Sequence, residues 1–597
     1  LNVNGSTASG SAVTVQSGAT LGGTGAVTGT ITTQSGGHVA PGTSPGILSS
    51  GNVSFTSGSF FDVEIGGTTP GNAATNHDQL NVTGPVDPGS ATLGNKFVIL
   101  VNDGSDLISG TFNGLLEGAT ISNFLNSGLD ATITYVANTD LGSVGNDVVL
   151  MVQAAATTTV SLDGSNNLVI TDTDGGNSDD SLTIKSDTTN SVFVISDPNN
   201  NIATSINGAT GSGTHTVMIP FSEVTGSEIQ VTTLAGNDSL TVDFSLGNFV
   251  KTITYNGGTQ TTSDSLTLTG GSTFSTVTHT FTSASAGTID VTGNSQISYL
   301  GLEPVTDNLS ATDRVFTFNG GAEAITLTDA TGAAMTIDST LGEVVTFANP
   351  SGSLTINAGT GDDTVTITSV DTDGPFNVSL TINGGADDDT GNPNADTTFA
   401  ADNSLDLDLR NDATAGDEEQ INVGLDVNLI LSGTGAATLT GSRNIALASG
   451  SSIATVNGGI TLSANQQTTP TSGNFIGLEA NNATIQTTGT GNILLEGTGG
   501  SDAGTSSHYG VYLHSGTSLS STASGVDAGT ITVNGTGGTG ISFNYGVVLF
   551  ETATNIATVD GAISITGIGG NGSGQRQAGV FLRHGPTIAS SGSGALA

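Results

Sequence analysis

Apolar residues alternate with small polar residues along most of this chain. Residues 61–65 read Phe-Asp-Val-Glu-Ile, and residues 353–357 read Ser-Leu-Thr-Ile-Asn. A period of two places every second side chain on the same face, which is typical of a strand with one buried face. No long segment has apolar residues at i, i+3, i+4 and i+7, the pattern of an amphipathic helix. The pattern therefore predicts an all-β protein.

The strand pattern repeats at a fixed interval in the middle of the chain. Residues 353–357 return as residues 379–383, 26 positions later, and each copy runs into a turn rich in Gly and Asp. Asp238 and Asp264, which precede two further Ser-Leu-Thr strands, are also 26 positions apart. A repeat of this size, made of β-strands and turns, predicts a solenoid whose units contact mainly their neighbours. This repeat defines a region over residues 153–412.

A second, longer repeat predicts another region over residues 413–597. Its key glycines, Gly477, Gly510, Gly546 and Gly579, are 33, 36 and 33 positions apart. Each copy contains three short apolar strands, and residues 444–447 open an earlier copy. The last copy stops at Ala597, where its second strand begins, so we expect the chain to be part of a longer protein.

Residues 1–152 form the first predicted region. Short alternating strands flank a segment with two Pro-Gly corners, residues 40–46, which predicts sharp turns at the edge of a solenoid. Residues 17–25, 40–46, 77–82 and 145–150 resemble the autotransporter-associated β-strand repeat of bacterial surface proteins. The resemblance implies a right-handed β-helical stalk on an exported protein and no catalytic residue.

Together these patterns predict the fold class and a family relationship. The Ser-Leu-Thr repeats of residues 153–412 resemble segments of very large β-strand-repeat proteins of environmental bacteria. We therefore expect a right-handed parallel β-helix or β-solenoid built of successive repeat regions, in which Gly occupies the corners.

Composition narrows the set of partners. The chain has 8 Lys and Arg against 52 Asp and Glu, so its net charge is 8 − 52 = −44. This charge opposes binding to nucleic acid and to anionic lipid and favours capture of divalent cations. With no Cys, the chain forms neither disulfides nor thiolate metal sites. No apolar run approaches the roughly 20 residues that cross a bilayer, so we expect no membrane insertion of this segment.

The Asp-rich turns are candidate calcium sites. Residues 358–365 resemble the calcium-binding nonapeptide of secreted RTX proteins, G-G-x-G-x-D-x-U-x, and depart from it at Ala358. The resemblance implies metal binding through Gly359, Gly361 and Asp363, with Asp180, Asp238 and Asp389 in related turns. The copies are at least 26 positions apart, so half-sites would have to meet across successive coils. The alternative is that Gly and Asp simply form the turns.

Catalytic and ligand-binding alternatives have weaker support in the sequence. Adjacent carboxylates such as Asp362 and Asp363 suggest acid–base chemistry or a polysaccharide lyase, but the few basic residues are scattered and there is no Trp to stack on sugars. We therefore expect no enzymatic activity. Four aromatic residues of the last region allow two interpretations, a stabilising stack or a ligand platform: Tyr509, Tyr512, Tyr545 and Phe581.

These observations predict a structural segment of a bacterial surface fibre, stalk or matrix protein, extracellular or on the cell surface. The expected partners are other copies of the chain, further repeats of the same chain, and surface glycans. One alternative is a calcium-dependent adhesin that binds glycans or another cell, and another is a glycan-cleaving β-helix.

Overall fold

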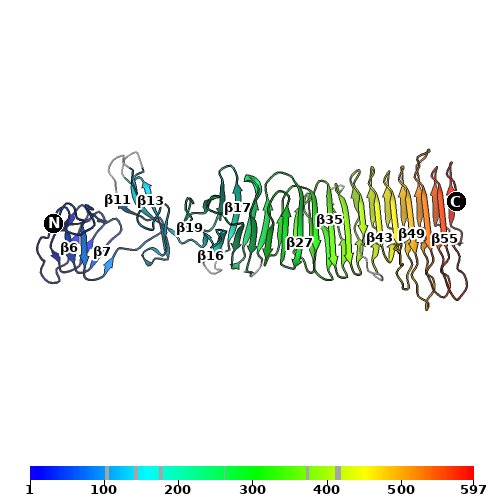
Figure 1. The fold of residues 1–597 in the computed structure, drawn as a ribbon, viewed down its shortest axis with the longest axis horizontal. Coiled ribbons are helices and arrows are strands. Elements are labelled where there is room, and N and C mark those ends of the chain that lie inside the picture. The colour runs from blue at the N-terminus through cyan, green and yellow to red at the C-terminus, as the bar shows by residue number, and fades with distance from the viewer. Residues whose placement is uncertain (101–106, 140–144, 174–178, 261–262, 371–375, 411–417) are drawn as a thin grey trace. The chain divides into compact units, whose positions relative to one another are not determined.

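The computed structural model describes residues 1–100, 107–139, 145–173, 179–260, 263–370, 376–410 and 418–597 (Figure 1). The chain divides into two compact units, Leu1–Ala156 and Thr157–Ala597. The described residues form β-strands and two single turns of 3₁₀ helix, Phe124–Asn126 and Phe244–Leu246, with no α-helix. The prediction of an all-β, solenoid-like fold is therefore confirmed. Within the described ranges, no helix is long and apolar enough to span a membrane.

The first unit begins with coils built from three small parallel sheets. The sheets contain β1 (Val13–Val15), β4 (Ile31–Thr33), β7 (Val53–Phe55) and β10 (Val86–Asp87); β2 (Thr20–Gly23), β5 (His38–Pro41) and β8 (Phe60–Phe61); and β3 (Ala26–Val27), β6 (Ile47–Ser50) and β9 (Gln79–Val82). Inward residues such as Leu21, Val39 and Leu48 stack in one core. Stacked coils thus occur where the sequence resembles autotransporter repeats.

Parallel stacking in the first unit ends at β10. The residues that follow form an antiparallel sheet of β11 (Lys96–Leu100), β14 (Asp147–Ala154), β13 (Leu129–Ala137) and β12 (Thr120–Ile121). This sheet has its own core around Ile133 and Val148. Residues 145–150, which resemble the end of a repeat unit, therefore lie in or next to an antiparallel strand.

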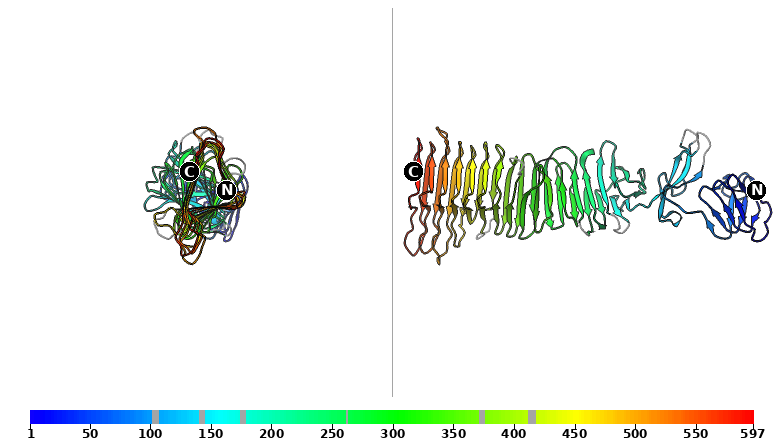
Figure 2. Two further views of the ribbon diagram at one scale, coloured as in Figure 1. Left: turned by 90° about the vertical axis from the view of Figure 1, so that its right-hand side faces the viewer. Right: turned by 180° about the vertical axis from the view of Figure 1, so that it is seen from behind.

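The second unit is built on two long sheets that face each other across one core (Figure 2). The first long sheet contains β15 (Thr158–Leu162), β16 (Leu168–Asp172), β19 (Ile202–Thr204), β21 (Glu228–Thr232), β24 (Thr252–Asn256), β27 (Phe274–Ser283), β28 (Ala286–Val291), β29 (Ile297–Leu300), β31 (Ala311–Phe318), β35 (Ser353–Thr360), β37 (Ser379–Ala386), β40 (Leu405–Asp408), β43 (Ala437–Gly441), β46 (Ile460–Ala464), β49 (Ile493–Thr498), β52 (Ile531–Thr536) and β55 (Ile563–Ile568).

The second long sheet receives the chain after each turn at the edge of the first. It contains β17 (Ser181–Asp187), β18 (Val192–Ser196), β20 (Thr216–Pro220), β23 (Ser239–Asp243), β26 (Ser265–Thr269), β30 (Val305–Asp307), β32 (Ala324–Asp329), β33 (Ala334–Ser339), β34 (Val345–Ala348), β36 (Thr364–Ile367), β38 (Thr390–Pro393), β41 (Gln420–Val423), β44 (Asn444–Leu447), β47 (Leu478–Asn481), β50 (Val511–His514), β53 (Val547–Phe550) and β56 (Val580–Arg583). A further short pair joins β22 (Ala235–Gly236) to β25 (Thr259–Gln260).

A third sheet begins at residue 397 and adds a third strand to each coil. Its strands are β39 (Thr397–Phe399), β42 (Asn428–Leu431), β45 (Ser452–Thr455), β48 (Thr484–Thr487), β51 (Ser518–Ser521), β54 (Asn555–Thr558) and β57 (Thr587–Ser590). The three strands per coil explain the longer repeat of the last region. Apart from residues 153–156, the predicted regions 153–412 and 413–597 both lie in the second unit and share the two long sheets.

Register follows the sequence repeat directly. Ser353, Leu354 and Thr355 of β35 pair with Ser379, Leu380 and Thr381 of β37 in parallel. The inward apolar residues of the strands form one continuous cluster that runs from Val160 to Ile563. Antiparallel hairpins interrupt the parallel order before β35, as in the group β27, β28 and β29.

Candidate functional site: the carboxylate column

One corner of the second unit, where the chain passes from the first to the second long sheet, carries a conspicuous row of acidic residues. In β36, for example, the first inward apolar residue is Val365, and Asp363 lies two positions before it. Strand pairing places an acidic residue at the same position of many coils. We call this set the carboxylate column: Asp180, Asp238, Asp264, Glu303, Glu323, Glu343, Asp363, Asp389 and Glu419.

Aspartates of the column hydrogen-bond to the backbone of the preceding coil. Oδ1 of Asp238 accepts from the backbone N–H of Asp180 at 2.8 Å, and Oδ1 of Asp264 accepts from Asp238 at 2.8 Å. Farther along, Oδ1 of Asp363 accepts from Glu323 at 2.8 Å and Oδ1 of Asp389 from Asp363 at 3.0 Å. A buried backbone N–H needs a partner. The short Asp side chain supplies it across the roughly 4.8 Å between neighbouring strands.

Burial makes these carboxyl groups weak acids. Burial, followed by the negative charges of Asp172 and Asp238, raises the pKa of Asp180 to about 7. Burial also raises the pKa of Asp363 to about 7 and that of Asp238 to about 6, although in both the backbone hydrogen bond opposes the shift. The second oxygen of each of these three carboxylates is buried and accepts no hydrogen bond within the described part of the chain. An unsolvated, unpaired oxygen favours the protonated form.

The pKa of Glu343, another member of the column, is raised as well. Its side chain is buried, and burial together with the charge of Glu303 raises its pKa to about 8. Glu303 lies two positions before Val305, which pairs with Val345, so the two glutamates occupy equivalent places on adjacent strands. Like charges this close favour protonation of one partner.

An exposed acidic row runs beside the column, one position earlier in the sequence. Oδ1 of Asp362 accepts from the backbone N–H of Asp388 at 3.2 Å, and Oδ1 of Asp388 accepts from Glu418 at 2.7 Å. Asp179 makes the equivalent bond with Asn237 at 2.9 Å. Because these side chains face solvent, cations in solution can reach them. The buried side chains of the carboxylate column are not accessible in this way.

The structure brings the predicted calcium ligands together in pairs. Asp180 and Asp238 lie in neighbouring coils, as do Asp363 and Asp389. The two pairs lie far apart along the sheet. The turn residues 175–178 lie outside the described residues. In the part of the chain that the structure describes, no group of three or more His, Asp or Glu side chains is arranged to hold a metal ion.

The two glycines predicted as calcium ligands, Gly359 and Gly361, are needed for the backbone conformation of the corner. Gly359 and Gly361 both have φ of +106°, a conformation that side chains disfavour. A Cβ atom at Gly359 would collide with the backbone oxygen of Phe318, and one at Gly361 with the backbone of Ala322. Both glycines are therefore required for close contact between coils, whatever the corner binds.

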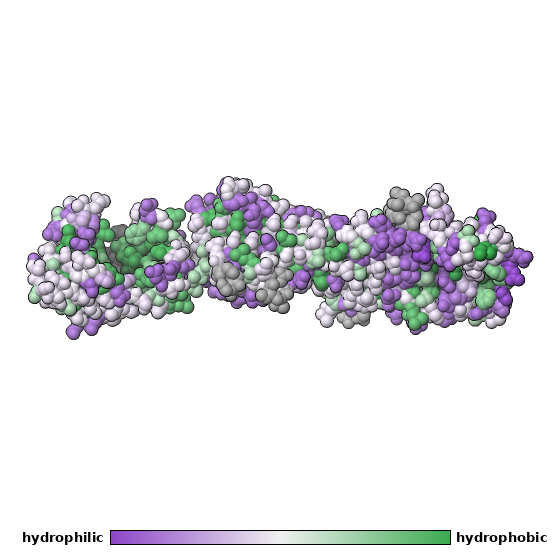
Figure 3. Space-filling model, turned by 90° about the horizontal axis from the view of Figure 1, so that it is seen from below, coloured by the Kyte–Doolittle hydropathy of each residue, from purple (hydrophilic) through white to green (hydrophobic). Residues whose placement is uncertain are grey.

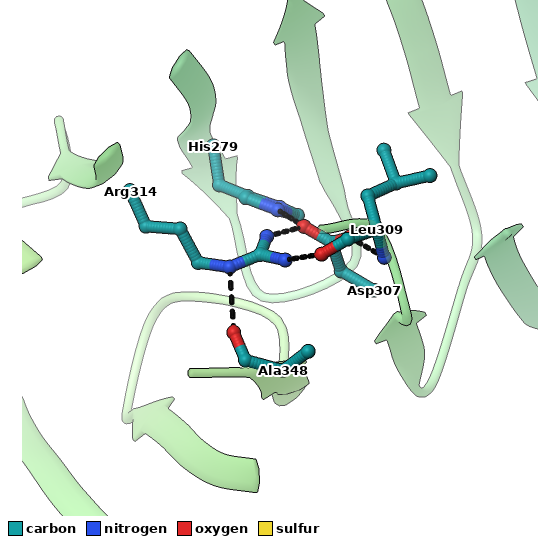
Figure 4. A network of polar contacts seen from close by, with 5 residues as sticks. All are labelled: His279, Asp307, Leu309, Arg314 and Ala348. Carbon is teal, nitrogen blue, oxygen red and sulfur yellow. Dashed lines mark hydrogen bonds and ion pairs between the residues drawn. The ribbon is translucent and has the colours of Figure 1, made fainter. Parts of the chain in front are cut away.

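A second polar group lies inside the core, where sequence reasoning did not place one (Figure 4). His279 and Arg314 extend inward from β27 and β31 of the first long sheet, and both contact Asp307 from β30 of the second. His279 Nε2 lies 3.0 Å from Asp307 Oδ2, and Arg314 Nη1 bonds the same oxygen. Arg314 also donates to the carbonyl oxygens of Ala348, at 2.8 Å, and Leu309. The group links the two long sheets.

All three side chains of this polar group are fully buried. Burial alone would raise the pKa of Asp307, but the hydrogen bond from His279 and the charge of Arg314 outweigh it and lower that pKa. Phe316 stacks on His279 with ring centroids 5.1 Å apart, and Phe347 lies under Arg314. Such enclosure suits a structural ion pair rather than a site that must admit a substrate.

The sequence contained a signal for this group. Arg314 alternates with Phe316 and Phe318, and His279 alternates with Val277 and Phe281. A charged residue in the inward register of a strand predicts a buried, paired charge. Asp307 carries the same signal, because it alternates with Val305 and Leu309. The pattern does not reveal that Asp307 pairs with His279 and Arg314, because these residues come from the other long sheet.

Comparisons with protein-family models, with curated proteins and with solved structures find no match. The fold and the corner chemistry therefore define the protein by class: an acidic, all-β repeat protein with a solenoid-like second unit.

Proposed function

We propose that this chain is a structural segment of an extracellular bacterial surface fibre, stalk or matrix protein, coiled as a right-handed parallel β-helix and without catalytic activity. The observation that carries the proposal is the single hydrophobic cluster that runs through the second unit. A continuous core with neighbour-only contacts suits a spacer that holds distance. The net charge of −44 favours solubility and mutual repulsion outside the cell.

The resemblance of residues 17–25 and 40–46 to autotransporter-associated repeats supports export to the cell surface. Further repeats of the same chain and other copies of it are the partners that this role requires.

Surface labelling tests the proposed location and role. An antibody raised against residues 1–597 is expected to label intact cells of the source organism without permeabilisation, because a spacer must lie outside the membrane. Immunogold microscopy measures the position of the label. Labelling that needs permeabilised cells would overturn the proposal.

A calcium-dependent adhesin is the second candidate, and the exposed acidic row beside the carboxylate column favours it. Asp362, Asp387 and Asp388 face solvent at one corner, and calcium prefers carboxylate and carbonyl oxygens on tight turns. The column residues Asp363 and Asp389 would then act as buried supports of the loop.

Calcium is expected to raise the melting temperature more than sodium at matched ionic strength. Sodium only screens repulsion, whereas bound calcium stabilises the folded state by mass action. Differential scanning calorimetry measures the difference for the unaltered chain and for Asp362→Asn/Asp388→Asn, which should lose it. The exposed Asp527→Asn is the matched control and should retain the full response. Equal effects of the two salts would remove the case for specific sites.

A further inference from the structure

The last coils carry a hollow on the outer face of the second long sheet, over β50, β53 and β56. Its volume is about 330 Å³, and aromatic and basic side chains line it. The lining includes Tyr509, Tyr512, Tyr545, Phe581, Arg576 and Arg583. On the face shown in Figure 3, hydrophilic side chains cover much of the C-terminal half of the second unit, with small hydrophobic areas among them.

Strand register relates this hollow to the carboxylate column. β41, which follows Glu419, pairs with β44, β44 with β47, β47 with β50, and β50 with β53. This succession of pairings continues the column position through the last coils. The residues at that position are Glu419, Arg443, Ile476, Tyr509 and Tyr545. The carboxylates therefore end at Glu419, Arg443 and Ile476 follow, and aromatic rings occupy the position at Tyr509 and Tyr545. The same corner of the coil has a different surface chemistry at this end.

The aromatic rings form a row along the stack. Tyr509 and Tyr545 are stacked with centroids 5.6 Å apart, and Tyr545 and Phe581 are stacked at 4.5 Å with planes 7° apart. Tyr512 meets Tyr509 edge to face at 5.1 Å. Stacking alone stabilises neighbouring coils. Tyr509, Tyr512 and Phe581 nevertheless remain partly exposed beside an open hollow, so their faces are available to a ligand.

The charge of the hollow is opposite to that of the protein. The chain has only 8 Lys and Arg against 52 Asp and Glu, yet Arg576 and Arg583 both line the hollow and no acidic residue does. Arg576 lies over the ring of Phe543 and Arg583 over that of Phe550, at 5.5 and 5.9 Å. Within the described residues neither guanidinium forms an ion pair. The aromatic contacts thus position both guanidinium groups, and their N–H groups remain available to a ligand.

We propose that this hollow binds a segment of an acidic glycan, with a sugar ring against the aromatic row and its carboxylate on Arg576 and Arg583. Guanidinium groups recognise carboxylates through paired hydrogen bonds, and aromatic faces attract the polarised C–H bonds of a sugar. The volume lies at the low end of the range of small-ligand sites, about 300–1,000 Å³. A protein partner would need about 800 Å² of contact surface, which favours a sugar as the occupant. The proposal stands apart from the spacer role and does not rest on it.

Titration of the full chain with trigalacturonic acid, and with its methyl ester as a neutral control, tests the proposal. The chain has no Trp and 6 Tyr, and Tyr509, Tyr512 and Tyr545 line the hollow, so tyrosine emission reports binding. We expect the acid to bind at least about tenfold more tightly than the ester, and its affinity to fall as salt rises.

Matched arginine variants locate the site. Arg576→Gln/Arg583→Gln is expected to weaken binding of the acid by about tenfold or more with an unchanged melting temperature, because both residues are exposed. Arg410→Gln, in another part of the second unit, should bind as the unaltered chain does. Equal affinity for acid and ester, equal loss in the Arg410 variant, or no binding of the acid would each overturn the proposal. Analytical ultracentrifugation provides a further test. The proposal would also be overturned if the unaltered chain self-associated, the double variant did not, and trigalacturonic acid left the association of the unaltered chain unchanged.

Discussion

Asp307→Asn is expected to lower the free energy of unfolding of the second unit by about 3–5 kcal/mol. Asp307 is the only carboxylate in its buried group, and it accepts from both His279 and Arg314. The asparagine amide leaves the guanidinium of Arg314 buried without a counter-charge, and an uncompensated buried charge is among the most destabilising changes known in proteins. Urea unfolding followed by far-ultraviolet circular dichroism measures the loss.

The exposed Asp290→Asn on β28 provides the matched control and should change the free energy of unfolding by no more than about 0.5 kcal/mol. Replacing the whole group with apolar residues, His279→Leu/Asp307→Leu/Arg314→Met, should cost much less than Asp307→Asn alone, because no charge then stays unpaired. A triple variant as unstable as the single one would show that packing around Phe316 and Phe347, rather than charge, dominates at this site.

The parts of the fold that depend on local pattern could be predicted from the sequence. The alternation in residues 353–357 and their return at 379–383 predicted both the strands and their pairing, and the structure pairs Ser353 with Ser379. The glycine spacing from Gly477 to Gly579 predicted coils of three strands, which β47 to β57 confirm. Repeats predict register because equivalent residues stack.

Strand direction could not be predicted in the same way. The hairpin of β27, β28 and β29 and the antiparallel sheet of β11 to β14 alternate as the parallel strands do. A period of two residues indicates which face of a strand is buried. It does not indicate whether the neighbouring strand runs parallel or antiparallel.

The candidate site was located in the sequence, but its environment was not. The turns around Asp363 and Asp389 stood out through their Gly and Asp content. Counting back two positions from the inward Val365 distinguishes the buried Asp363 from the exposed Asp362. The hydrogen bond from one coil to the next depends on how the coils pack against each other. The amino-acid composition of the turns does not reveal this packing.

The free energy of unfolding is expected to fall as the pH rises from about 5 to about 8, in contrast to most proteins. In the folded state the pKa values of Asp238, Asp180 and Asp363 are raised to about 6, 7 and 7, and that of Glu343 to about 8. Unfolded Asp and Glu titrate near 4, so the folded protein holds more protons between about pH 4 and 8. The contribution of these protonated groups to the free energy of unfolding is fully present below about pH 4. It is lost as the pH rises from there through the raised pKa values of the folded state. Acids with lowered pKa values, such as Asp307 and Asp243, act in the opposite sense but only below about pH 4.

Asp363→Asn isolates the contribution of one carboxyl group. Asparagine keeps the oxygen that accepts from the Glu323 N–H and removes the charge, so we expect the variant to gain about 1–2 kcal/mol at pH 8 and about a third of that gain at pH 5. Asp363→Ala also removes the charge but leaves that N–H without its acceptor, and it should be less stable than Asp363→Asn at both pH values by about 1–3 kcal/mol. The exposed Asp527→Asn should show no dependence of its effect on pH. Thermal and urea unfolding at the two pH values measure all three. An Asp363→Asn variant that is equally destabilised at pH 5 and pH 8 would mean that the buried carboxylate is ionised and satisfied, and that the column is not held together by protonated acids.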